Sequence, residues 1–133
     1  MKFDFGSARE IPPIEATSGL ADGLVEYEFV RFALADTSQV LLITNMRLLI
    51  IVGEETSGGE PSGQAIFSFF SRAVLTYQLR LSSLQDSNLH PVASKLEIVF
   101  SSPAEVLEVA LPGLRSTATL RRAISQFALG TRD

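Results

Sequence analysis

The sequence has no cysteine, no tryptophan and a single histidine among its 133 residues. Without cysteine the chain cannot form disulfides, carry out thiolate chemistry, or build zinc and iron–sulfur sites of the cysteine type. This composition fits a cytoplasmic protein, which is the location we expect. The histidine, His90, lies in a polar stretch before Pro91, which favours a solvent-exposed loop residue over a metal ligand or a member of a catalytic triad. We predict no metal site and no cofactor.

Positive charge and long apolar runs are also scarce. Eleven Lys and Arg stand against fifteen Asp and Glu, for a net charge of -4, and Arg121-Arg122 is the only basic pair. This balance disfavours nucleic acid, whose affinity rests on neutralised phosphates, and also disfavours anionic lipid surfaces. The longest apolar stretches, Val40–Ile43 and Leu48–Val52, are far shorter than the ~20 residues of a membrane-spanning helix. Residues 1–10 contain an acid and no apolar run, so we expect no secretory signal.

The length suits one domain with its own core. We expect an irregular N-terminal arm over residues 1–19, which is rich in Pro, Gly, Ser and Thr, followed by a domain over residues 20–133. Four apolar residues of the arm could attach it to its own domain or to a neighbouring subunit: Phe3, Phe5, Ile11 and Ile14.

The strongest local signal is a β-hairpin. Val40–Thr44 and Arg47–Val52 are rich in β-branched residues and Leu, and Asn45-Met46 separates them. Asn tolerates the positive φ that tight hairpin turns need. Because both segments are almost continuously apolar, we expect central strands covered on both faces, or covered on one face by a partner.

A further strand is predicted over Leu24–Leu34, but its alternation changes phase. Apolar residues first occupy the odd positions from Val25 to Phe29 and then the even positions from Val30 onward. A one-residue slip exchanges the faces of a strand, so we predict a β-bulge or bend near Phe29–Val30. Glu26 and Glu28 share one face, where we expect solvent to hold both carboxylates rather than acid–base chemistry.

The second half of the chain carries the remaining signals. Gly53–Gly63 has no apolar residue, reads as an exposed loop and matches no phosphate-binding glycine motif. Alternating or aromatic segments after it predict strands over Gln64–Phe70, Val74–Leu81, Lys95–Phe100 and Glu105–Leu111, with a polar connection over Ser82–Ser94.

The last segment changes to a helical period. Apolar residues recur at helical spacing: Leu120, Ala123, Ile124, Phe127 and Ala128. We predict an amphipathic helix over Thr117–Leu129, capped by Ser116 or Thr117 and ended by Gly130. About seven strands followed by one helix indicate a mainly β (α+β) protein, a bent antiparallel sandwich or open barrel closed by its helix.

The hairpin resembles a known family. Val40–Val52 is similar to the Thr-Asn-x-Arg-Leu hairpin of bacterial pleckstrin-homology-like (PH-like) domains. Ile66–Leu79 resembles another segment of that family, with four matching residues: Ser68, Phe69, Phe70 and Val74. The resemblance covers about residues 22–130 and implies a seven-stranded bent sandwich or barrel capped by a helix. Some members form rings or other homo-oligomers, and eukaryotic relatives bind phosphoinositides through a basic loop that is Glu-rich or neutral here.

The candidate binding residues are Arg47, Arg72, Phe69 and Phe70. Arg47 follows the hairpin turn, where it could donate to carbonyls or stack, or bind an anion; Arg72 has the same alternatives. Phe69 and Phe70 point to opposite faces of a strand, so one of them could occupy an interface. We therefore expect a non-catalytic module acting through protein–protein contacts, in the form of a homo-oligomer. The alternatives are a lipid-headgroup or membrane-surface module, using Arg47, Arg72 and Arg80, and a small enzyme of unrecognised type.

Overall fold

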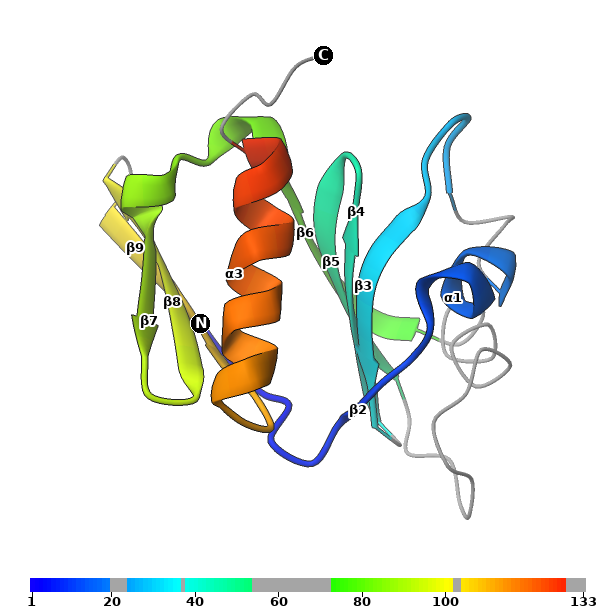
Figure 1. Ribbon diagram of the computed structural model, residues 1–133, viewed down its shortest axis with the longest axis horizontal. Helices are drawn as coiled ribbons and strands as arrows, with labels where there is room; N and C mark the ends of the chain where they lie inside the picture. The colour runs from blue at the N-terminus through cyan, green and yellow to red at the C-terminus, as the bar shows by residue number, and fades with distance from the viewer. Residues whose placement is uncertain (20–23, 37, 54–72, 102–103, 129–133) are drawn as a thin grey trace. The chain divides into compact units, whose positions relative to one another are not determined.

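A computed structural model of the chain describes residues 1–19, 24–36, 38–53, 73–101 and 104–128 (Figure 1). The chain divides into two compact units, Ala8–Arg80 and Met1–Ser7 with Leu81–Asp133. Within the described residues the protein is mainly β, with nine strands in two sheets and a C-terminal helix packed on strands. The division into an arm over residues 1–19 and a domain over residues 20–133 is a different one and stays a prediction.

The unit Ala8–Arg80 is built on an antiparallel sheet with the strand order β2-β3-β4-β5-β6. Its strands are β2 (Arg9–Glu10), β3 (Val30–Ala35), β4 (Gln39–Thr44), β5 (Arg47–Gly53) and β6 (Ala73–Arg80). A short helix, α1 (Pro13–Gly19), packs on β3.

The predicted hairpin is confirmed, but its turn works differently. β4 and β5 pair with Ile43 opposite Leu48, and Asn45-Met46 forms the connection. Positive φ occurs at two of the described non-glycine residues, and Asn45 is not one of them. Instead, the Thr44 hydroxyl accepts hydrogen bonds from the amides of Met46 and Arg47, both at 3.0 Å. A side chain thus satisfies the turn amides that a mirror-image turn would otherwise satisfy with backbone carbonyls.

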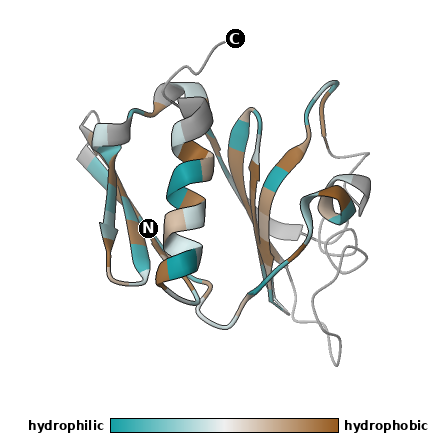
Figure 2. Cartoon of the chain, in the orientation of Figure 1, coloured by the Kyte–Doolittle hydropathy of each residue, from teal (hydrophilic) through white to brown (hydrophobic). Residues whose placement is uncertain are grey.

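The hairpin strands are buried on both faces, as their continuous apolar sequence predicts. Adjacent residues point to opposite faces of a strand, and Leu41 and Leu42 are both fully buried. Figure 2 shows hydrophobic colour along the strands and hydrophilic colour at the turn end of the hairpin. One face forms a cluster with residues of β2–α1 and β3, namely Ile11, Ala16, Val30, Ala33, Ala35, Val40, Leu42, Leu49 and Ile51.

The strand predicted over Leu24–Leu34 is wrong in its first half. β3 begins at Val30, and the register irregularity lies between Val30 and Phe32, close to the predicted bulge. Before Val30 the expected alternation is absent, because Glu28 is buried whereas Glu26, Tyr27 and Phe29 are exposed. The segment is a turn, so the two-residue period carried no information about its burial.

The other unit contains a four-stranded sheet with the order β1-β9-β8-β7. Its strands are β1 (Lys2–Asp4), β7 (Leu89–Val92), β8 (Lys95–Ser101) and β9 (Ala104–Ala110), and two 3-10 turns, η2 (Leu81–Ser83) and η3 (Asp86–Asn88), precede β7. β1 runs parallel to β9, and the other pairs are antiparallel. The alternation predicted for β8 and β9 is confirmed by the burial of Leu96, Ile98, Leu107 and Val109.

The C-terminal helix, α3, spans Leu114–Ala128 and packs on η2, β7 and β8. Leu120 and Ile124 of the predicted apolar stripe are fully buried. The predicted cap is wrong, because the helix begins three residues before Thr117. The Thr117 hydroxyl lies inside the first turn and donates to the Gly113 carbonyl at 3.0 Å.

Regular structure also occurs in residues 1–19, where we expected none: β1, β2 and α1 lie there. Phe5 and Ile11 are buried, which fits the expected anchoring role, whereas Ile14 is exposed. Most of the predicted Gly53–Gly63 loop and all of the aromatic strand predicted over Gln64–Phe70 lie outside the described residues.

Candidate functional site

A tight turn precedes β3. The Glu28 amide donates to the Val25 carbonyl at 3.0 Å, which closes a four-residue turn. Tyr27 stands at its third position with φ 66°. Turns of this kind favour glycine there, because a left-handed conformation costs an L-residue about 1–2 kcal/mol. A tyrosine is therefore held in a backbone conformation that its own chemistry disfavours.

A buried ion pair holds this turn in place. The Glu28 side chain is fully buried, and Arg47 at the start of β5 donates to both of its oxygens, from Nε at 2.9 Å and from Nη2 at 3.0 Å. The Thr44 hydroxyl donates to the same carboxylate at 2.7 Å, and the Val25 amide does so at 3.1 Å. Four donors thus surround one carboxylate, which satisfies a buried charge that would otherwise be costly.

These contacts set the protonation of the carboxyl group. Burial alone raises the pKa of Glu28, because it disfavours the charged form. The hydrogen bonds from Arg47, Thr44 and the Val25 amide, together with the positive charge of Arg47, outweigh burial and hold the pKa below its ordinary value. Glu28 is therefore an anion at neutral pH.

Asn45 makes a second tie between the two segments. Its side chain accepts from the Phe29 amide at 2.9 Å and donates to the Tyr27 carbonyl at 3.1 Å. The Asn45 amide donates to the Phe29 carbonyl at 3.1 Å. Figure 1 shows the segment before β3 rising beside the turn end of the β4–β5 hairpin. Asn45 thus joins the two turns.

This scaffold presents four apolar side chains to solvent, which we call the turn patch: Val25, Tyr27, Phe29 and Met46. Their exposed fractions are 56%, 84%, 42% and 37%. The Arg31 guanidinium lies over the Phe29 ring, 5.9 Å from its centroid, in cation–π geometry. An apolar patch that internal hydrogen bonds hold in place is typical of a contact surface.

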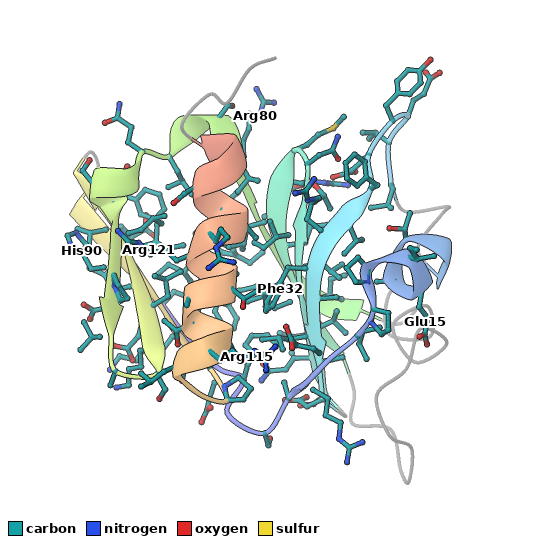
Figure 3. The ribbon with its side chains drawn as sticks, in the orientation of Figure 1. Glu15, Phe32, Arg80, His90, Arg115 and Arg121 are labelled. Atoms are coloured by element: carbon teal, nitrogen blue, oxygen red, sulfur yellow. The ribbon has the colours of Figure 1, made fainter. Side chains whose placement is uncertain are left out.

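The predicted candidate Arg47 makes contacts of the structural kind, and they include both side-chain oxygens of Glu28. Besides binding Glu28, it donates from Nη1 to the Gln78 side chain at 2.9 Å. Arg80, labelled in Figure 3, is the residue paired with Arg47 in the β5–β6 ladder. An anion-binding role for Arg47 stays a prediction. Arg72, Phe69 and Phe70 lie outside the described residues, and their roles also stay predictions.

Two expectations about polar residues have different outcomes. His90 is exposed, as predicted, but it belongs to the edge strand β7 rather than to a loop (Figure 3). The prediction that solvent holds both Glu26 and Glu28 is wrong for Glu28, because Arg47 and Thr44 enclose it. Sequence reasoning missed Tyr27 and Glu28, since alternation from Val25 to Phe29 resembles an ordinary strand.

The described part of the chain has neither a metal-binding cluster nor a membrane-spanning helix. In residues 1–19, 24–36, 38–53, 73–101 and 104–128, no group of three or more His, Asp or Glu lies in an arrangement that could hold a metal ion. None of the helices in the same part of the chain has the length and apolar character needed to cross a membrane.

No protein-family model, curated protein or solved structure matches this chain. The fold therefore defines only a broad class, that of a mainly β protein with a C-terminal helix.

Proposed function

We propose that this protein is a non-catalytic module that acts through protein–protein contacts, with the turn patch as its contact surface and self-association as its mode. One observation carries the proposal: Tyr27 is largely exposed on a backbone with positive φ. Strain of this kind clusters at functional sites, where the surrounding structure over-determines it.

A purely structural account of Tyr27 is weak. The position requires a left-handed backbone, which glycine would adopt without strain, and the ring faces solvent instead of a core. Rigid aromatic side chains are enriched at protein contacts, because they bring large apolar area at low entropic cost. The ion pair between Glu28 and Arg47 orders the turn before any partner arrives, which lowers the cost of binding.

The finer classification as a bacterial PH-like domain is part of the same proposal. It rests on the Thr44–Leu48 hairpin sequence and on the order of strands followed by a closing helix. In that family, homo-oligomers made through protein contacts are a known mode of action, which agrees with the use proposed for the turn patch.

The test is photo-crosslinking in living cells of the source organism. A benzoylphenylalanine at position 27 should crosslink one copy of this chain to another, and mass spectrometry should identify both halves of the adduct as this protein. The matched control places the same group at Leu114, which is exposed on α3 and lies outside the turn patch. No adduct at position 27, or identical adducts at both positions, would overturn the proposal.

A further inference from the structure

We infer that the turn before β3 has two states: it is closed while the Glu28 carboxylate is an anion held by Arg47, and it opens over residues 25–29, with the sheet still folded, when that charge is removed. The inference rests on the proposed function and adds the regulation of its surface, because the turn patch exists only on the closed turn. It follows from what holds this segment, from the strain in it, and from where its ends are anchored.

Polar contacts, and not apolar burial, hold residues 25–29 in place. Glu28 has the one buried side chain among these five residues, whereas their apolar side chains face solvent. In the described part of the chain, every hydrogen bond between this segment and the hairpin involves Glu28 or Asn45. A segment with so little buried apolar area has low local stability, so these two residues decide whether the turn is closed.

Backbone strain acts against the closed turn. Tyr27 has a φ of 66°, which is disfavoured for an L-residue, and an open segment is free to leave this conformation. The ionised carboxylate offsets the strain, because hydrogen bonds to a charged acceptor are about twice as strong as neutral ones. Without the charge these bonds weaken, the Arg47 guanidinium loses its counter-charge, and the strain remains. Removal of the charge therefore shifts the equilibrium toward the open turn.

Both ends of the segment are anchored independently of Glu28. Leu24 packs against the apolar cluster on one face of the sheet, and Val30 belongs to that cluster. The Val30 amide donates to the Thr17 hydroxyl of α1 at 2.9 Å, and Val30 pairs with Thr44 in the β3–β4 ladder. Opening is therefore confined to the residues between these anchors, and the sheet keeps its pairing.

Protonation removes the charge without a change of sequence. Burial raises the pKa of Glu28, but the hydrogen bonds from Arg47, Thr44 and the Val25 amide, with the charge of Arg47, outweigh it and hold the pKa below 4.5 in the closed turn. The open turn therefore binds the proton more tightly, so the closed turn keeps its full advantage above pH 4.5 and loses it as the pH falls through the lowered pKa. Arg47 supplies the positive charge at Glu28, and the other ionisable residues beside this contact are Glu26, Tyr27, Arg31 and Arg80.

The experiment is residue-resolved hydrogen exchange by NMR on the full chain and its variants, at urea concentrations below the unfolding transition. In Glu28→Gln the Phe29 amide should exchange about 30-fold faster than in the parent chain, and its rate should depend little on urea, because local opening exposes little surface. The Leu42 amide of the central strand β4 should show a steep urea dependence, which reports global unfolding and shows that the variant is folded. A urea dependence at Phe29 as steep as that at Leu42 would overturn the inference.

The pH dependence tests the same equilibrium in the parent chain. Protection of the Phe29 amide, corrected for the intrinsic exchange rate, should fall as the pH drops below 4.5 while Leu42 stays protected. Glu28→Gln should show no such fall, and Glu26→Gln, which changes an exposed carboxylate, should behave like the parent chain. The same pH profile at Phe29 in both variants would overturn the role of the Glu28 charge.

The crosslinking group at position 27 links the two states to the function. A partner that binds only the closed turn has an apparent affinity reduced in proportion to the closed fraction, so Glu28→Gln should lower the crosslink yield about tenfold. Glu10→Gln, at an exposed residue of β2 outside the turn patch, should leave the yield unchanged. An unchanged yield in Glu28→Gln overturns the inference while the crosslinks themselves uphold the proposed function. No crosslink in the parent chain overturns the proposed function, and hydrogen exchange then decides the two states of the turn by itself.

Discussion

Glu28 and Arg47 show how a single pair of residues organises the site. They are 19 positions apart, and each lies in a segment whose local sequence suggests something else. An acidic residue between two apolar residues is typical of the solvent-exposed face of a strand. Glu28 is buried because the hairpin brings Thr44, at the end of β4, and Arg47, at the start of β5, together at its carboxylate. No local pattern contains that information, so the charge partner could not be predicted.

At this scale we predict that Glu28→Gln lowers the free energy of unfolding by about 2–3 kcal/mol at pH 7. The change removes the charge that balances Arg47, and a buried group that loses its partner costs several kcal/mol. We place the loss at the lower end because the Arg47 side chain is 24% exposed and keeps some hydration. Urea unfolding followed by circular dichroism measures it, with Glu26→Gln as the exposed control, which should change by less than about 0.5 kcal/mol.

The same carboxylate predicts a pH dependence. The folded pKa of Glu28 lies below its ordinary value of 4.5, so the unfolded chain binds the proton more tightly. The stability that Glu28 contributes is therefore fully present above pH 4.5 and is lost as the pH falls through the folded pKa. Glu28→Gln should flatten this part of the stability profile and Glu26→Gln should not; equal profiles for both variants would contradict the role of the ion pair.

At the scale of elements, the sequence predicts the β4–β5 hairpin, but the positive φ expected at Asn45 does not occur. Two β-branched segments with a two-residue connection are sufficient to indicate β4 and β5. The role of Asn45 depended on its neighbours, since its side chain bonds the backbone of the turn before β3. β7 was missed because it has four residues and contains Pro91, which strand patterns penalise and edge strands tolerate.

The role of the Asn45 side chain leads to a prediction that opposes the usual rule, by which glycine favours a tight hairpin turn. Asn45→Gly should destabilise the protein by about 1–2 kcal/mol, because Asn45 does not use positive φ and its side chain satisfies two backbone groups. Thermal and urea unfolding measure the change. Met46→Gly, at the adjacent turn position whose side chain is exposed, is the control. Greater stability of Asn45→Gly than of the parent chain would show that the turn prefers a left-handed residue.

At the scale of the whole molecule, the chain ends contribute to one unit through pairing of distant segments. β1 lies beside β9 in parallel, with Phe3 opposite Val109. The Glu108 amide donates to the Met1 carbonyl at 2.9 Å, and the Phe5 amide donates to the Ala110 carbonyl at 2.8 Å. A three-residue strand carries no usable period, so its position in the sheet could not be read from the sequence.

Phe5 therefore tests the architecture of this unit. Phe5→Ala should cost about 3–4 kcal/mol, because the side chain is fully buried and its removal leaves a cavity. Hydrogen exchange should show faster exchange at the Glu108 amide, which depends on β1 for its acceptor. Ile14→Ala, an exposed apolar residue of the same N-terminal segment, should change stability by less than about 0.5 kcal/mol. Unchanged protection of Glu108 in Phe5→Ala would indicate that β1 is held without its anchor.

By itself, the sequence determined the parts of this protein that depend on local periodicity. These are the β4–β5 hairpin, the alternating faces of β8 and β9, and the buried stripe of α3, where neighbours along the chain share one burial pattern. The tertiary structure alone decided the turn before β3, because the burial of Glu28 and the exposure of Tyr27 depend on donors that arrive from β4 and β5. It also decided the place of β1, since hydrogen bonding between chain segments about a hundred residues apart leaves no trace in a local pattern.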